Sequence, residues 1–195
     1  MRRILVVVLS LSVMSFGFDW QRKGFVLGGG AGVSHSAFII KFTDLPDSPQ
    51  QKEAGLATDF VIGYGFNQNF MLTFFTNTDW FHTSYLYSKR VLIANGNSGV
   101  GGFYYFNPSA ASPYVFGGLG WSGWSAPREK NEDSWVGPGF TLGVGYEFSK
   151  HFSVQLNMLS TNPSKELGAL EEGGNTITEE ASTLGFQLNI VAIAY

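Results

Sequence analysis

The chain has 195 residues, a formal net charge of −3 and no cysteine. The missing cysteines exclude disulfides, cysteine-bound zinc and thiol nucleophiles, and the excess of acidic residues argues against nucleic acid as a partner. No apolar run approaches the roughly 18 residues that a membrane-spanning helix needs, which excludes a helical inner-membrane protein.

The first 17 residues have the features of a secretory signal peptide. Met1 is followed by two arginines, and then by a short apolar stretch over residues 4–13. Ser15 and Gly17 place small residues where signal peptidase requires them. We therefore expect a signal peptide over residues 1–17 and a single domain over residues 18–195. A short buried helix is the alternative interpretation of the same residues.

From residue 24 onwards, eight short segments alternate apolar residues with small or polar ones. The clearest runs from Phe140 to Phe148, where the even positions are apolar or aromatic and the odd positions are Thr, Gly, Gly and Glu. Successive side chains of a strand point to opposite faces, so this pattern predicts strands with one apolar and one polar face. The expected strands cover residues 24–34, 56–66, 70–80, 91–106, 114–124, 140–148, 152–160 and 183–195.

The polar face of these strands is rich in Gly, Thr, Asn, Gln and acids, whereas the apolar face carries large aromatic residues near its ends. This is typical of a barrel whose outside contacts lipid. We therefore expect an all-β fold, an eight-stranded antiparallel up-and-down transmembrane β-barrel. Polar residues expected in the lumen are Asp59, Glu147, Gln187 and Asn189. Aromatic residues expected at the membrane interfaces are Trp80, Trp121, Trp124, Phe148 and Tyr195. The alternative is a soluble barrel with its apolar face inward.

The connections between the expected strands alternate in length. Short turns follow the second, fourth and sixth strands, and long polar loops cover about residues 36–55, 81–90, 125–135 and 161–182. Short periplasmic turns and long extracellular loops are typical of outer-membrane barrels. An even number of strands then leaves both ends of the barrel on the periplasmic side.

Several segments resemble the small OmpA/OmpX-type eight-stranded outer-membrane proteins. The matching segments are residues 24–32, 60–67 and 142–148, together with the terminal aromatic Tyr195. The resemblance implies a location in the outer membrane of a Gram-negative-type bacterium. It also implies contact with outer-membrane lipid and lipopolysaccharide, and recognition of Tyr195 by the barrel-assembly machinery.

Enzymes also occur on this type of barrel, and His82-Thr83-Ser84 has the spacing of the His-x-Ser pair of lipid A deacylases. The continuation expected of those enzymes is missing, because Tyr85 follows. The glycine-rich stretch 28–32 lacks the Lys-Ser/Thr of a phosphate-binding loop, so we interpret it as room for larger neighbours in a tight barrel. The three histidines are scattered, so we expect no metal site, no cofactor and no catalytic residues.

The function predicted from the sequence is a non-enzymatic structural or surface-interaction role carried by four extracellular loops, with the surface ligand unknown. One alternative is a narrow cation or small-solute channel, because Asp59 and Glu147 fall in the lumen phase without a cation clearly placed beside them. The second alternative is a lipid A-modifying enzyme that uses Ser84.

Overall fold

The structure is a computed structural model that describes residues 21–42, 46–84, 89–109, 111–129, 134–169 and 176–195. The expected signal peptide, residues 1–17, lies outside these ranges. Within them, no helix is long and apolar enough to cross a membrane. The strands are β1 (Gly24–Phe42), β2 (Gln51–Gly65), β3 (Phe70–Thr83), β4 (Val91–Tyr105), β5 (Ser112–Ser125), β6 (Trp135–Ser149), β7 (Phe152–Thr161), β8 (Ser164–Ala169) and β9 (Thr176–Ala194).

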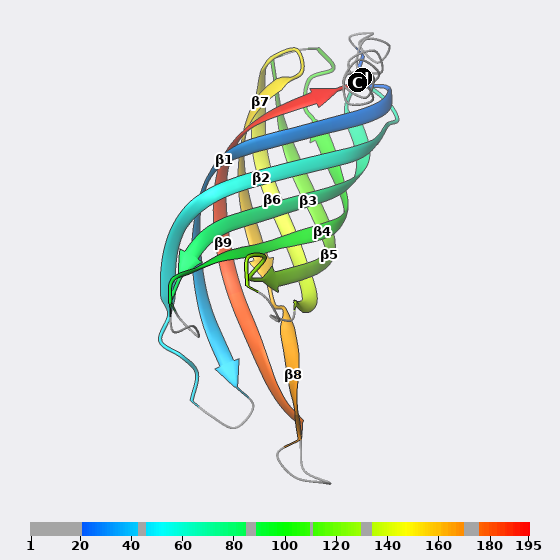
Figure 1. The fold of residues 1–195 in the computed structure, drawn as a ribbon. Coiled ribbons are helices and arrows are strands. Elements are labelled where there is room, and N and C mark those ends of the chain that lie inside the picture. Colours follow the sequence, from blue (N-terminus) through cyan, green and yellow to red (C-terminus); the bar gives the residue numbers. More distant parts are fainter. Residues whose placement is uncertain (1–20, 43–45, 85–88, 110, 130–133, 170–175) are drawn as a thin grey trace, which may run out of the picture.

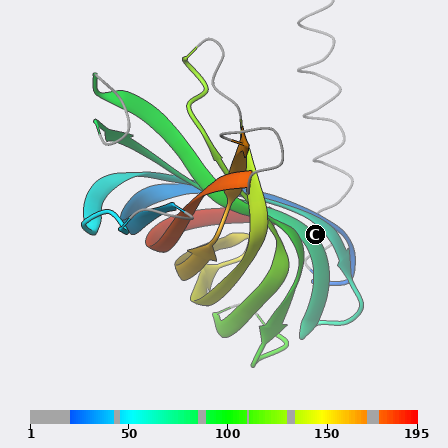
Figure 2. The same ribbon diagram turned by 90° about the horizontal axis from the view of Figure 1, so that it is seen from below.

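Each strand pairs antiparallel with its neighbour, from β1 through β7 and then to β9. The first and last strands also pair, from Leu27 with Ala194 to Phe42 with Glu179, which closes the sheet on itself. The eight-stranded up-and-down barrel predicted from the sequence is therefore confirmed. Figure 1 shows the tilted strands of the wall, and Figure 2 shows them from the end at which β8 lies. The remaining strand, β8, is not part of the closed ring and pairs along β9.

The side chains of the wall alternate as the sequence predicts. Large apolar residues face outward and stay exposed, with Leu119 at 73% and Leu56 at 65%. Inward positions carry polar, aromatic and aliphatic side chains, and glycines make room for the rings. A Cβ atom on Gly118 would overlap the ring of Phe75, and one on Gly145 would overlap the ring of Tyr114. Small residues on the inner face therefore allow a narrow barrel to hold several aromatic side chains.

The predicted short turns join β2 to β3, β4 to β5 and β6 to β7 at one end of the barrel. In the first, the side chain of Asn67 accepts hydrogen bonds from the backbone of Asn69 and Phe70, both at 2.9 Å. In the third, His151 takes a left-handed conformation with a φ of 71°. These turns lie at the top of Figure 1, together with the C-terminal end of β9.

Two of the four predicted long loops are largely strands, which corrects the sequence analysis. Residues 36–42 of β1, 51–54 of β2, 164–169 of β8 and 176–182 of β9 form a four-stranded sheet beyond the closed ring. We call it the projecting sheet; it extends below the barrel in Figure 1. The predicted first strand ends at residue 34 because polar and apolar residues alternate less regularly beyond it. The pairing of β1 with β9 nevertheless continues to Phe42.

Candidate functional site: the barrel interior

The short-turn end of the interior is closed by Arg22, which precedes β1 and is only 2% exposed. Its Nε donates to Glu147 Oε2 at 3.0 Å, and the guanidinium lies 4.0 Å from the centre of the Tyr105 ring. Its other nitrogens donate to the carbonyl oxygens of Gln68, Asn107 and Ser109, at 2.8–3.0 Å. One side chain therefore links two of the short turns to β6.

Glu147 lies in the interior, as expected, and accepts a second hydrogen bond from the hydroxyl of Tyr195 at 3.0 Å. Burial alone would lower the pKa of Arg22, but the hydrogen bond and charge of Glu147 outweigh burial and raise the pKa above its ordinary value. The guanidinium is therefore charged at every physiological pH. Arg22 lies outside the alternating segments, so the sequence pattern predicts no cation beside Glu147; the structure corrects this.

Next to this ion pair, an apolar layer fills the interior. Rings from neighbouring strands pack closely in tilted pairs, with 4.6 Å between the centres of Phe103 and Phe116 and 4.8 Å between those of Tyr105 and Tyr114. The layer consists of Val26, Val61, Met71, Phe75, Phe103, Tyr105, Tyr114, Phe116, Val191, Ile193 and Tyr195. Each of these residues is 4% exposed or less, so apolar and aromatic groups pack densely at this level.

A polar layer occupies the middle of the barrel and holds the other three predicted lumen residues. Asp59 accepts hydrogen bonds from the amides of Asn77 at 2.7 Å and Asn189 at 2.5 Å. A second carboxylate, Asp79, accepts from Gln187 at 2.7 Å and from the hydroxyl of Ser36, also at 2.7 Å.

The two carboxylates belong to one network, because Asn189 also donates to Gln187 at 3.3 Å. Among the described residues, no cationic side chain forms an ion pair with Asp59 or Asp79. Amide and hydroxyl donors therefore stabilise the two acids, as a buried carboxylate requires. Asp79 is the acid that the sequence analysis left out of its site, although it lies in the same inward phase of β3 as Thr73 and Asn77.

A second apolar layer closes the long-loop end of the interior. Trp124 is at its centre, 5.1 Å from the ring centre of Phe38 and 5.6 Å from that of Phe81. The layer consists of Phe38, Ile40, Phe81, Val91, Ile93, Trp124, Ala126, Trp135 and Ala181. The prediction that Trp124 lies at the membrane interface is therefore wrong, since the side chain is 1% exposed. Both faces of β5 carry aromatics and glycines, so its sequence does not reveal which face points inward.

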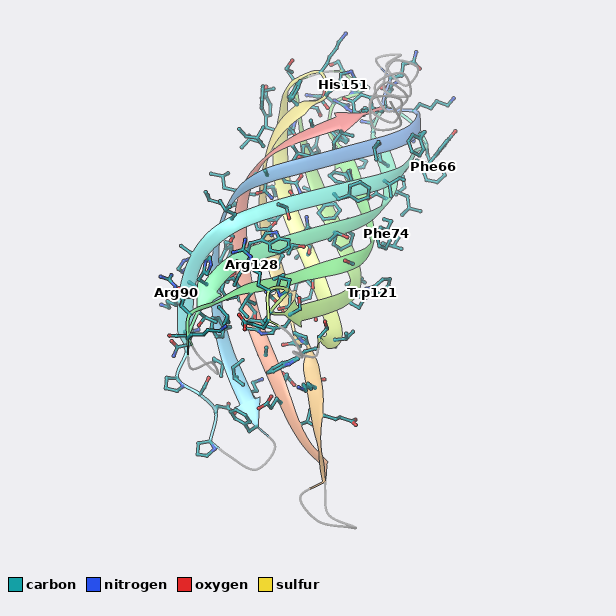
Figure 3. All side chains as sticks on the ribbon, viewed as in Figure 1. Phe66, Phe74, Arg90, Trp121, Arg128 and His151 are labelled. Carbon is teal, nitrogen blue, oxygen red and sulfur yellow. The ribbon has the colours of Figure 1, made fainter. Side chains whose placement is uncertain are left out.

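Tyr195 is also misplaced in the sequence analysis as an interfacial residue. It is 4% exposed, because its hydroxyl reaches inward to Glu147. Trp121 and Phe148 do face outward and are exposed by 55% and 53%. Trp80 faces outward and is partly buried, with its indole nitrogen donating to the Thr58 hydroxyl at 2.9 Å. Figure 3 shows Phe66 near the short turns and Trp121 nearer the long-loop end.

At the short-turn end, a recess of about 240 Å³ is lined by Arg22, Gln68, Pro108, Ser109, Glu147, Lys150 and Tyr195. A smaller space lies deeper in the barrel. A cavity of about 10 Å³ lies between the polar layer and the first apolar layer, lined by Gly29, Asp59, Val61, Asn77, Phe103, Phe116, Gln155 and Val191. A cavity of about this volume holds roughly one water molecule. The interior thus consists of a polar layer between two apolar layers, with an ion pair across the short-turn end.

The candidate enzyme residues lie on the outside of the wall. His82 is exposed near the end of β3, and Ser84, the residue after that strand, is exposed as well. No hydrogen bond joins the two in the structure, although both are among the described residues. Over the same ranges, no cluster of three His, Asp or Glu side chains could hold a metal ion.

Comparison with known proteins identifies the fold. The profile of the outer membrane protein beta-barrel domain matches residues 4–191. The outer membrane protein OprG from Pseudomonas aeruginosa is 13% identical, with a TM-score of 0.52, over 91% of this chain and 99% of OprG. The outer membrane protein AlkL, determined in lipid bilayers, is 12% identical, with a TM-score of 0.51, over 89% of this chain and 91% of AlkL. No curated protein sequence matches the chain.

Proposed function

This chain belongs to the outer membrane protein beta-barrel domain family and lies in the outer membrane of a Gram-negative-type bacterium, and we propose that it is a sealed, non-enzymatic barrel that presents an extracellular interaction surface. The observation that carries the proposal is the packed interior. Two apolar layers fill the interior on either side of the polar layer, where the cavity measures about 10 Å³, and a recess of about 240 Å³ lined by Arg22 and Glu147 lies at the short-turn end. In a barrel filled in this way, the groups that a partner can contact lie on the outside.

The projecting sheet supports an interaction role. It continues the wall past the closed ring. Among the described residues, its outer strands, β2 over residues 51–54 and β8, each pair along only one edge for most of their length. An exposed strand edge offers backbone donors and acceptors to a partner. Lys41 and Glu180 pair across it at 3.4 Å, both partly exposed. The sheet therefore offers backbone hydrogen bonding and charges of both signs to a partner outside the cell.

The packing does not favour the narrow-channel alternative. Asp59 and Asp79 are held by amides and a hydroxyl in the middle of the barrel, and an apolar layer lies on each side of them. An ion would have to lose most of its hydration shell to pass both layers, which costs several kcal/mol.

The enzyme alternative has weak support. His82 and Ser84 form no hydrogen bond with each other, whereas a serine nucleophile needs a base within reach, although such contacts can be loose before substrate binds. Comparison of lipid A masses between cells that produce the wild-type protein and cells that produce Ser84→Ala tests this alternative. We expect identical lipid A in both, and a modification lost only with Ser84→Ala would contradict a non-enzymatic role.

A shortened variant tests the role of the projecting sheet. The backbone nitrogen of Ala181 donates to the carbonyl oxygen of Pro163 at 2.8 Å, so residues 164–180 can be replaced by an Asn-Gly turn. The matched control replaces residues 127–134, between β5 and β6, with the same turn. Both variants should keep the heat-dependent gel mobility of a folded barrel.

Each variant is produced separately in a strain that lacks the gene. For each of these strains, we measure adhesion to protein- and polysaccharide-coated surfaces and the resistance of the cells to SDS. Under the proposal, the variant without residues 164–180 loses adhesion, and the control variant keeps it. If the shortened variant restores every property of the wild-type strain, the projecting sheet has no interaction role and the barrel serves the envelope structurally.

A further inference from the structure

The outer wall carries an apolar hollow where β1 and β9 close the barrel. It has a volume of about 460 Å³ and lies near the short-turn end. Its lining consists of Leu27, Gly28, Gly29, Phe60, His151, Phe152, Ala192, Ile193 and Ala194. Apart from His151, every residue of this lining is apolar or glycine.

The strand register explains the hollow. Gly29 on β1 lies opposite Ala192 on β9, and both face outward. Phe60 on β2 lies beside Gly29, and Phe152 on β7 lies beside Ala192, so the four residues form one row across the wall. Neighbouring strands are about 4.8 Å apart, so two small residues form a trough between two phenylalanines whose backbones are roughly 14 Å apart.

The trough differs from a place elsewhere on the outer wall where two outward-facing glycines, Gly102 on β4 and Gly117 on β5, lie opposite each other. There, neighbouring side chains cover the glycines. A Cβ atom on Gly102 would lie 3.2 Å from the ring of Phe70, and one on Gly117 would lie 3.7 Å from Leu142. A Cβ atom on Gly29 would meet only the backbone oxygen of Asp59, at 3.4 Å. The trough is therefore not filled by the side chains next to it.

Basic side chains lie at the short-turn end of the trough. His151 is fixed there, because its Nδ1 lies 2.9 Å from the carbonyl oxygen of Ile193 and its own carbonyl accepts from the Ile193 nitrogen at 2.8 Å. Lys150 precedes it, is exposed, and lines a neighbouring polar recess together with Arg22. Figure 3 shows His151 at this end of the barrel. The apolar trough therefore ends at the basic side chains of Lys150 and His151, at the end of the barrel that faces water.

We propose that the trough binds one acyl chain of a glycerophospholipid from the periplasmic leaflet, with the phosphate of that lipid at Lys150 and His151. The short turns of an outer-membrane barrel face the periplasm, so the trough lies at the depth of the inner leaflet. An apolar trough that ends at basic side chains matches an acyl chain that ends at an anionic headgroup. The inference depends on family membership and not on the interaction role proposed above.

Native mass spectrometry tests the site. The full barrel is reconstituted into vesicles of phosphatidylethanolamine and phosphatidylglycerol, extracted into mild detergent, and measured for the fraction that retains one phospholipid. The double variant Gly29→Leu/Ala192→Leu fills the trough, and Gly117→Leu adds the same side chain elsewhere on the outer wall. Each variant is first shown to have the heat-dependent gel mobility of the folded barrel. If the double variant does not fold, Ala192→Leu alone replaces it.

We expect the wild-type protein and Gly117→Leu to retain one phospholipid equally. Filling the trough should lower that fraction about tenfold, because several methylene contacts are lost. Lys150→Gln should lower retention of phosphatidylglycerol more than retention of phosphatidylethanolamine, because the former carries a net negative charge. The proposal is overturned if the wild-type protein retains no phospholipid, if the filled variant retains as much as wild type, or if Gly117→Leu loses as much as the filled variant.

Discussion

Breaking the ion pair between Arg22 and Glu147 should be among the most destabilising single changes in this barrel. The two side chains are 3% and 4% exposed, and 3.0 Å separates the paired atoms. In Arg22→Met, Glu147 keeps its hydrogen bond from Tyr195 but loses its counter-charge, and the carbonyl oxygens of Gln68, Asn107 and Ser109 lose their donor. Removing one partner of a buried ion pair costs about 3–5 kcal/mol.

The matched control is the exposed pair between Lys41 and Glu180, whose side chains are 42% and 39% exposed. Lys41→Met should cost about 0–1 kcal/mol, because solvent screens an exposed pair. The assay is urea unfolding of the barrel in lipid vesicles, followed by tryptophan fluorescence.

A double-mutant cycle separates the pair from the rest of the packing. Glu147→Gln should destabilise the barrel, and Arg22→Met combined with Glu147→Gln should cost less than the sum of the two single variants. If Arg22→Met costs no more than Lys41→Met, or if the two single effects simply add, the inference that the ion pair fastens the short-turn end is wrong.

Two further predictions compare inward with outward positions. Trp124→Ala should destabilise the barrel by about 3–5 kcal/mol, because it opens a cavity in the second apolar layer. Trp121→Ala, on the exposed face, should cost far less. Equal effects of the two substitutions in urea unfolding would contradict the inward placement of Trp124. Gly118→Val should prevent folding or destabilise the barrel strongly, because its Cβ would overlap the ring of Phe75, whereas Gly117→Val should be tolerated. Heat-dependent gel mobility distinguishes these outcomes, and a fully folded Gly118→Val protein would refute the packing argument.

Much of the fold could be predicted from the sequence, because alternation reports directly on which face of a strand is buried. In β6, the outward and inward phases from Phe140 to Phe148 match the structure at every position. In β5 both faces carry aromatic residues and glycines, so the inward placement of Trp124 depends on packing across the barrel, which a periodicity does not contain.

The polar interior was predicted in part. Asp59, Gln187 and Asn189 lie in strands with clean alternation, so their inward positions follow from the pattern. Arg22 lies before the first strand, and only the closed barrel brings it to Glu147, 125 positions along the chain. The length of β1 and β9 was underestimated because these extensions gain their regular structure from pairing between strands: residues 36–42 pair with β9 and in part with β2, and residues 176–182 pair with β8 and in part with β1.

Electrical recording across planar bilayers tests the central claim, a sealed interior, most directly. The protein is inserted as a heat-modifiable, folded barrel, and the current is compared with that of the protein-free bilayer. A cavity of about 10 Å³ between two apolar layers predicts no added conductance, for the wild-type protein and for Asp59→Asn alike. A stable conductance in the wild-type protein that falls in Asp59→Asn would contradict the sealed interior and show that ions pass through the polar layer.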